Sequence, residues 1–88
     1  MKTLEQIENK VSFEELVKEL VFQIKNKEIQ QITNNSDPFC TKKDLLQMHE
    51  ENSYPDYLRC YFQDIKTKKV FLLSIETYHG IGGSFIPI

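Results

Sequence analysis

Cysteine is scarce in this sequence, which limits how the chain can be held together. The two cysteines, Cys40 and Cys60, are too few and too irregularly spaced for a disulfide framework or a paired-cysteine zinc site. A zinc site that also uses His49 and His79 is not expected, because His49 falls in a predicted helix and Cys60 in a predicted strand. We therefore expect no metal and no cofactor, and we expect Cys60 to act as a small apolar core side chain.

Long apolar runs and a large net charge are also missing. No segment approaches the roughly 18 apolar residues of a membrane-spanning helix, and the first residues lack the apolar core of a signal peptide. We therefore expect a cytoplasmic protein that does not enter a membrane. The formal charge is −2, from 11 Lys and Arg against 13 Asp and Glu. This charge is too small to attract the whole molecule to nucleic acid, so any electrostatic partner must be met by a local patch.

The length of the chain leaves room for one domain. With 88 residues we predict a single unit, residues 1–88, built around one hydrophobic core. A chain of this size buries only about two thirds of the surface that its unfolded form exposes. A deep cleft between domains is therefore excluded, and we expect function to reside on a surface.

Residues 57–78 carry the clearest structural signal, a pair of strands around a polar turn. Apolar and polar side chains alternate along residues 57–64 and again along 69–78, which is the period of a half-buried strand. Only registers that join an even-numbered residue of the first strand to an odd-numbered residue of the second put both apolar sets on one face. A short turn at Lys66 and Thr67 meets this condition. It predicts four pairs: Leu58–Ile75, Cys60–Leu73, Phe62–Phe71 and Tyr57–Glu76.

An amphipathic helix is predicted before this hairpin. Ser12 and Glu15 form a capping box that marks its start, and apolar residues recur at helical spacing from Phe13 onward. The apolar stripe continues through Ile32, so we predict a helix over about residues 13–32. A break near Asn26 is the alternative.

Two further helical segments are indicated by capping patterns. Thr41 and Asp44 repeat the capping box and predict a short helix over about residues 42–50. A Thr-x-x-Gln pattern that begins at Thr3 predicts a short helical turn as far as about Glu8. The polar stretch that ends at Pro38 is expected to be a loop.

The end of the chain predicts a third strand. After a turn that contains all three glycines, residues 84–88 can return beside the second strand, and Pro87 suits a sheet edge because it cannot donate a ladder hydrogen bond. The predicted fold class is α+β. It consists of an N-terminal amphipathic helix (about 13–32) and a short helix (about 42–50) packed on a three-stranded antiparallel β-meander (about 57–64, 69–78 and 84–88).

The outward face of the hairpin is the first candidate site. Its residues are of the types that anchor protein interfaces, with large rigid side chains and a polar end. They are Tyr57, Arg59, Tyr61, Leu72, Glu76 and Tyr78. Val70 enlarges the apolar area beyond that of single exposed residues. The alternative is that these residues form ordinary cross-strand pairs on a solvated sheet.

A basic cluster at the predicted turn suggests a second kind of site. It consists of Lys66, Lys68 and Lys69. Lysines beside an aromatic sheet can bind single-stranded nucleic acid, in which bases stack on the rings and lysines hold the phosphates. Lysines also solubilise turns and hinder unwanted strand pairing. Because the chain has no basic excess, nucleic-acid binding is the alternative to protein binding.

The segment from Tyr78 to Ser84 is the third candidate. Its glycines permit positive φ and close approach of a ligand, and successive amides can bind an anion. The order of elements argues against a dinucleotide site, because these glycines lead into a predicted strand and not into a helix. His79 is the best general-base candidate for a small enzyme. However, Glu76 and Cys60 point to opposite faces of the sheet, so we predict no catalytic residues.

Acidic side chains on the long predicted helix are the fourth candidate. They are Glu14, Glu15 and Glu19. Carboxylates near a helix start complement its dipole, but an acidic surface with aromatic anchors is also what an inhibitor of a basic protein presents. We therefore predict an inhibitor, immunity or regulatory protein that binds another protein through the sheet face and the acidic helix surface. A homodimer through the open sheet edge or the aromatic face is the other use we foresee for these surfaces.

Overall fold

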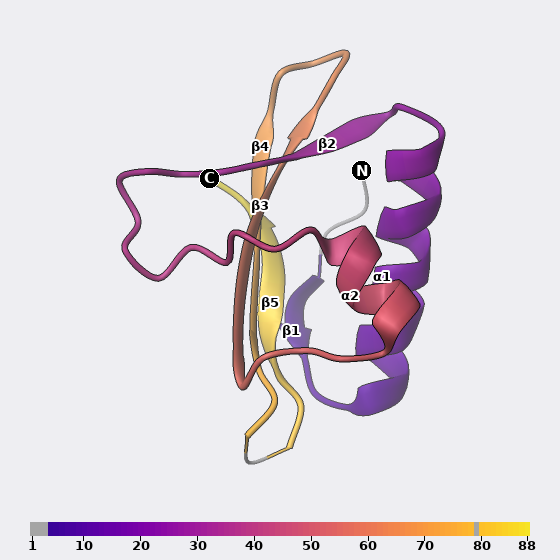
Figure 1. Ribbon diagram of the computed structural model, residues 1–88, viewed down its shortest axis with the longest axis vertical. Helices are drawn as coiled ribbons and strands as arrows, with labels where there is room; N and C mark the ends of the chain where they lie inside the picture. Colours follow the sequence, from indigo (N-terminus) through magenta and orange to yellow (C-terminus); the bar gives the residue numbers. More distant parts are fainter. Residues whose placement is uncertain (1–3, 79) are drawn as a thin grey trace.

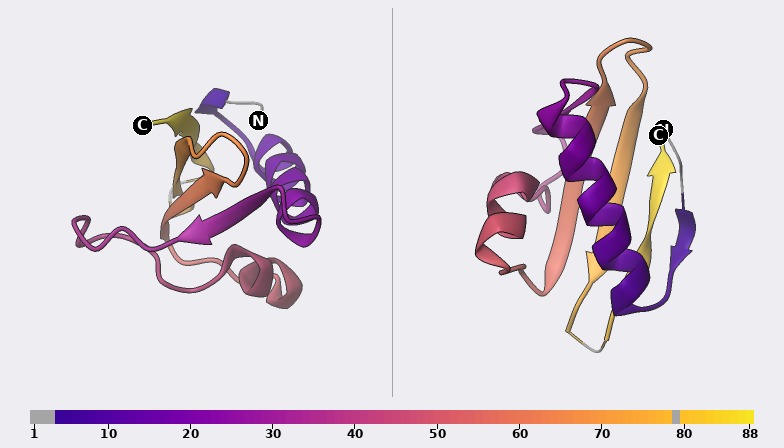
Figure 2. Two further views of the ribbon diagram at one scale, coloured as in Figure 1. Left: turned by 90° about the horizontal axis from the view of Figure 1, so that it is seen from above. Right: turned by 90° about the vertical axis from the view of Figure 1, so that its right-hand side faces the viewer.

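The computed structural model describes residues 4–78 and 80–88, which form an antiparallel sheet with two helices on one face (Figure 1, Figure 2). The strands are β1 (Leu4–Ile7), β2 (Ile29–Ile32), β3 (Tyr57–Asp64), β4 (Val70–Glu76) and β5 (Gly82–Pro87). The helices are α1 (Lys10–Lys25) and α2 (Leu45–Glu51). In space the strands follow the order β1-β5-β4-β3-β2. The α+β class is confirmed, and the predicted three-stranded meander is the centre of a five-stranded sheet in the described part of the chain.

The predicted register of the β3–β4 hairpin is confirmed. The four pairs are present: Leu58 with Ile75, Cys60 with Leu73, Phe62 with Phe71, and Tyr57 with Glu76. Asp64 organises the turn, because its Oδ1 accepts the N–H groups of both Lys66 and Thr67 at 2.9 Å. Lys68 then takes a left-handed conformation, with φ 68°, and lets the chain return. Because even-numbered residues of β3 pair with odd-numbered residues of β4, the apolar side chains of both strands lie on the same face of the sheet.

The prediction of one helix over residues 13–32 is wrong, and the alternative break near Asn26 is confirmed. Lys27 takes a left-handed conformation with φ 60°. Its N–H donates to the Ile24 carbonyl, and the next N–H donates to the Gln23 carbonyl. This pair of bonds is the Schellman motif, which ends a helix. Ile29 then begins β2, where it stays apolar and buried but pairs along the edge of β3.

Helix α1 begins one turn before the predicted capping box. Asn9 is the N-cap, and its Oδ1 accepts the Ser12 N–H at 2.9 Å. Asparagine and serine are about equally good N-caps, so their propensities did not separate the two starting points. The helical turn predicted over residues 3–8 is also wrong from Leu4 onward, because Leu4–Ile7 pairs with β5 as a strand. Its predicted start, Thr3, lies outside the described residues.

The capping box predicted for the second helix is replaced by a contact from a distant strand. Asp44 stands at the N-cap of α2 without a side-chain capping bond. Instead, Gln31 of β2 accepts the Leu45 N–H at 2.7 Å and donates to the Lys43 carbonyl at 3.0 Å. Thr41 bonds to β3. The amide of Gln31 therefore docks the start of α2 against the sheet.

The core fills the space between the sheet and the two helices, which lie on the same face (Figure 2). The helices contribute Phe13, Leu16, Val17, Leu20, Val21, Leu45 and Met48, and the strands contribute Ile7, Ile29, Leu58, Cys60, Phe62, Phe71, Leu73, Ile75 and Phe85. The prediction that the C-terminal strand is a sheet edge is wrong, because β1 pairs along its outer side. The other face of the sheet is not covered by either helix, and the candidate site lies there (Figure 2).

Candidate functional site

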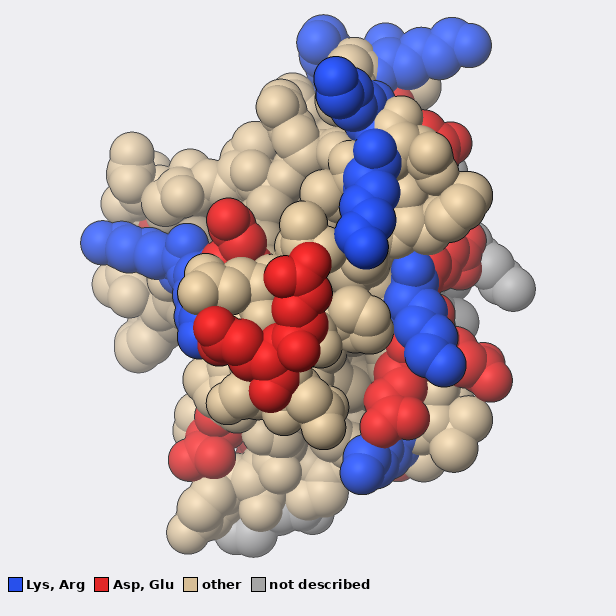
Figure 3. Space-filling model, turned by 45° about the vertical axis from the view of Figure 1, so that its right-hand side comes forward, with Lys and Arg blue, Asp and Glu red and all other residues tan. Residues whose placement is uncertain are grey.

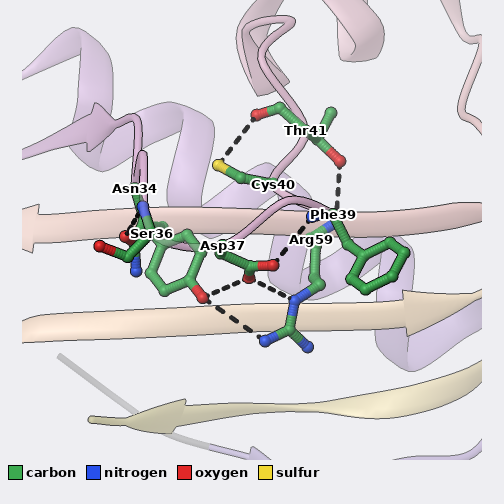
Figure 4. Close-up of polar contacts among 8 residues, drawn as sticks. Asn34, Ser36, Asp37, Phe39, Cys40, Thr41 and Arg59 are labelled. Carbon is green, nitrogen blue, oxygen red and sulfur yellow. Dashed lines mark hydrogen bonds and ion pairs between the residues drawn. The ribbon is translucent and has the colours of Figure 1, made fainter.

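The face of the sheet opposite the helices carries the candidate site. The connection between β2 and α2 leaves the sheet, turns on this side, and returns across β3 to reach α2 (Figure 1, Figure 4). Two residues of this connection, Asp37 and Thr41, are bonded to β3. They turn an irregular loop into a fixed wall at one side of the open face.

Asp37 makes the first attachment. Its Oδ2 accepts a hydrogen bond from Arg59 Nε at 2.6 Å and another from the Tyr61 hydroxyl at 2.5 Å, while its Oδ1 accepts the Phe39 N–H (Figure 4). The hydroxyl of Tyr61, then the guanidinium of Arg59, lower the pKa of the Asp37 carboxyl to about 2. The carboxylate is therefore ionised throughout the physiological range, and it holds the loop to two residues of β3.

Thr41 makes the second attachment. Its N–H donates to the Arg59 carbonyl at 2.8 Å, and its Oγ1 accepts the Arg59 N–H at 2.9 Å (Figure 4). These bonds satisfy the backbone N–H and carbonyl of Arg59, which lies on the edge of β3 beyond the last pair with β2, Ile32 with Tyr61. Arg59 is thus held through its side chain by Asp37 and through its backbone by Thr41.

An open groove of about 650 Å³ lies beside this wall. It is lined by Phe39, Tyr57, Leu58, Arg59, Ser74, Ile75, Glu76, Gly82 and Gly83. Two aromatic side chains on its lining are largely exposed, Phe39 at 78 % and Tyr57 at 67 %. Gly82 and Gly83 add no side chains to the β5 side, where Gly83 lies so close to β4 that a Cβ would be 1.9 Å from the Ser74 carbonyl oxygen. The result is a mostly apolar depression between exposed aromatic rings.

The structure separates the six residues predicted for the sheet face into two groups. Tyr57, Arg59 and Glu76 line the groove, and Tyr78, just past the end of β4, is exposed. In contrast, Tyr61 is 4 % exposed and Leu72 is 9 % exposed. The expectation that Tyr61 faces a partner directly is wrong, because its hydroxyl is occupied by Asp37 and its ring is covered. Tyr61 and Leu72 are paired on the same face as Arg59 but are buried there, so they offer no exposed contact area.

The predicted charged residues lie away from the groove. Glu14, Glu15 and Glu19 are exposed on α1, on the other side of the sheet, where acidic and basic side chains intermingle (Figure 3). Lys66, Lys68 and Lys69 are exposed at the β3–β4 turn. Seven residue steps of β3 separate that turn from Tyr57, a distance of about 23 Å. The structure therefore brings together neither the lysines with the exposed aromatic rings nor the acidic helix face with the groove.

The residues considered for catalysis or metal binding include His79 and Cys60. His79 lies outside the described residues. Cys60 is fully buried, and burial raises the pKa of its thiol to about 12, so it is not a nucleophile near neutral pH. Across residues 4–78 and 80–88, no group of three or more His, Cys, Asp or Glu side chains is arranged to hold a metal ion. Within those same residues, neither helix has the length and apolar character needed to cross a membrane.

Sequence reasoning missed the two loop residues that shape the groove, Asp37 and Phe39. The path of a loop across a sheet depends on the strands beneath it and leaves no periodic pattern in the loop itself. The one available signal is Phe39, an aromatic residue that follows a proline in a polar stretch, where a core partner is not expected.

Comparison of the chain with protein-family models, curated proteins and solved structures gives no match. The function is therefore inferred from the geometry of the open face.

Proposed function

We propose that this protein binds another protein by accommodating part of its surface in the groove between Phe39 and Tyr57. The observation that carries the proposal is the pairing of two largely exposed aromatic rings with a mostly apolar groove of about 650 Å³. Exposed aromatic side chains around a depression are typical of residues that dominate binding energy, because they bury a large rigid area at low entropic cost.

The wall of the groove supports this proposal because it is already ordered. Asp37 and Thr41 attach the loop to β3 through hydrogen bonds of 2.5–2.9 Å. A preformed site loses little conformational entropy when it binds, so more of the contact energy appears as affinity. We propose that the protein acts stoichiometrically, as an inhibitor, immunity or regulatory partner, through this intact groove. The acidic side chains of α1 lie on the far side of the sheet and are a separate, secondary contact surface.

Single-stranded nucleic-acid binding is the second candidate, favoured by the three exposed lysines at the β3–β4 turn. Single-stranded nucleic-acid binding needs aromatic rings that stack on bases close to basic side chains that bind the phosphates. Here the lysines are about 23 Å along the strand from Tyr57, and Tyr61 is buried, so the two halves of such a platform are apart. The geometry therefore favours a protein partner.

The test compares groove variants with a matched exposed aromatic residue elsewhere. Wild type, Phe39→Ala, Tyr57→Ala and the control Phe22→Ala are used to isolate binding proteins from cells of the source organism. Phe22 is 64 % exposed on α1, so its removal costs similar exposed area on the other side of the sheet. A captured protein is then purified, and its complex is reconstituted and measured by calorimetry.

We expect a one-to-one complex whose affinity falls at least tenfold for each groove variant, about 1.4 kcal/mol, and stays within twofold for Phe22→Ala. Equal affinities for all four proteins would remove the groove from consideration. A salt-sensitive gel shift with a single-stranded oligonucleotide, abolished by replacing Lys66, Lys68 and Lys69 with alanine, would support the second candidate instead.

A further inference from the structure

The charged side chains at the open groove restrict what can enter it. Arg59 lines the groove, but its Nε already donates to the Asp37 carboxylate at 2.6 Å. Glu76 is a second carboxylate, and it lies on the groove lining itself. The formal charges of Asp37, Arg59 and Glu76 sum to −1. An anionic group that entered the groove would meet two carboxylates, whereas a cationic group is attracted.

The register of the sheet places Glu76 between an aromatic residue and a position without a side chain. Tyr57 pairs with Glu76, and Glu76 pairs with Gly82, so the three residues form one row across β3, β4 and β5. Directly opposed strand residues have Cβ atoms about 4.5–5.5 Å apart. No atom lies within 4 Å of the place that a Cβ on Gly82 would take. The side chain of Glu76 therefore has Tyr57 on one side and open space on the other.

An arginine side chain matches this row of residues. Its planar guanidinium binds a carboxylate through two parallel N–H bonds and stacks on aromatic rings, whereas the ammonium group of lysine acts as a point charge. Glu76 already takes part in another contact, but a carboxylate has room for about four hydrogen bonds and so can accept further donors. Glu76 is also half-buried, and partial removal from water strengthens its attraction for a cation.

We infer that the groove accepts an arginine side chain from the surface of the partner protein, with the guanidinium on the Glu76 carboxylate and against the Tyr57 ring. The aliphatic part of that arginine covers apolar lining, and an adjoining apolar side chain of the partner contacts Phe39. A groove of about 650 Å³ is within the range of about 300–1,000 Å³ that holds small ligands, so it has room for both side chains. This inference rests on the proposed function and names the chemistry of the partner.

The test uses four capped tripeptides as probes for the partner. Each has leucine at both ends, and the central residue is arginine, citrulline, lysine or glutamate. Citrulline has nearly the shape of arginine but carries no charge, so this pair isolates the contribution of the charge. Each peptide is titrated into the isotope-labelled full chain at low salt, and the backbone N–H signals of Tyr57, Glu76 and Gly82 are followed by NMR.

For wild type we expect saturable shifts of these signals with the arginine peptide, and a dissociation constant at least about fivefold lower than that of the citrulline peptide. The lysine peptide should fall between these two, and the glutamate peptide should bind most weakly. Glu76→Gln keeps the shape of the side chain and should reduce the arginine preference to less than about twofold. The control Glu28→Gln removes the same charge from the exposed turn between α1 and β2, where the Glu28 carbonyl accepts the Ile65 N–H, and should keep the full preference.

The comparison of peptides on wild type is the deciding measurement, because it needs no variant to fold. Equal dissociation constants for the arginine and citrulline peptides, tighter binding of the glutamate peptide, or no saturable shift of the three groove signals would overturn the inference. An arginine preference that survives in Glu76→Gln would overturn it as well. These outcomes leave the proposed function standing, because that function is tested by the losses in Phe39→Ala and Tyr57→Ala against a captured partner. Equal affinities in that test would remove the groove as the partner's site whether or not the arginine peptide binds.

Discussion

Gly83→Ala is expected to destabilise the protein severely, while the neighbouring substitution Gly82→Ala is expected to be tolerated. A Cβ on Gly83 would lie 1.9 Å from the Ser74 carbonyl oxygen and 2.9 Å from the Ile75 Cα. These obstacles belong to the backbone of β4, the central strand, so no side-chain rotation can relieve them. The added methyl group must push β5 away by about 1 Å, which breaks the β4–β5 ladder locally.

The magnitude follows from the kind of obstacle. Overpacking against adjustable side chains costs about 1–3 kcal/mol, so a clash with two backbone atoms should cost about 3 kcal/mol or more. In a domain of this size 1 kcal/mol shifts the melting temperature by about 4–8 °C, so we expect a fall of about 12–24 °C. Circular dichroism during thermal and urea unfolding measures both quantities.

The control separates this clash from a general effect of replacing glycine. A Cβ on Gly82 meets no atom within 4 Å. Gly82→Ala should therefore change the free energy of unfolding by less than about 0.5 kcal/mol, or stabilise the fold slightly by restricting the unfolded chain. Similar losses of stability in the two variants, or a harmless Gly83→Ala, would refute the close approach of β5 to β4.

Three further outcomes follow from the loops and caps. Lys27→Gly should stabilise the protein by about 1 kcal/mol in urea unfolding, because it removes a Cβ from a residue with φ 60°. An unchanged urea midpoint would argue against the left-handed backbone conformation of Lys27 at the end of α1. Gln31→Ala should cost about 1 kcal/mol because the Leu45 N–H loses its acceptor, whereas Asp44→Ala should cost at most half as much; the reverse order would contradict the long-range cap. The pKa of Asp37 is lower in the folded state than its ordinary value of 3.8, so its stabilising contribution is complete above that value and is lost as the pH falls through about 2. The free energy of unfolding of wild type and of Asp37→Asn, measured as a function of pH, should differ between about pH 4 and pH 2. Superimposable curves would show that the carboxylate does not hold the loop.

The parts of the fold that were predictable are those whose signal lies within one element. The register of the β3–β4 hairpin follows from parity alone, because a shift by one residue would turn Leu58, Cys60 and Phe62 to the opposite face. The apolar stripe of α1 likewise identifies a helix. Its end was harder to locate, because Ile29 suits the stripe of a continuing helix as well as a buried position in β2.

The edge strands and the caps depended on partners far away in the chain. Leu4–Ile7 is four residues long and has too short a pattern to identify a strand, but it finds β5 at the other end of the sequence. Helix α2 is capped by Gln31, which no local capping rule considers. The groove wall depends on distant partners in the same way, because Asp37 bonds Arg59 and Tyr61, which lie 22 and 24 positions further along the chain.

By itself, the sequence determined which side chains of β3 and β4 face inward and that an amphipathic helix covers them, because alternation and helical period are properties of consecutive residues. The number of strands beside that hairpin, the cap of α2 and the open groove lined by Phe39 and Tyr57 depend instead on contacts between distant segments. The physical reason is that edge hydrogen bonds and loop attachments are satisfied by whichever group the completed sheet brings within reach, and that group has no fixed spacing along the chain.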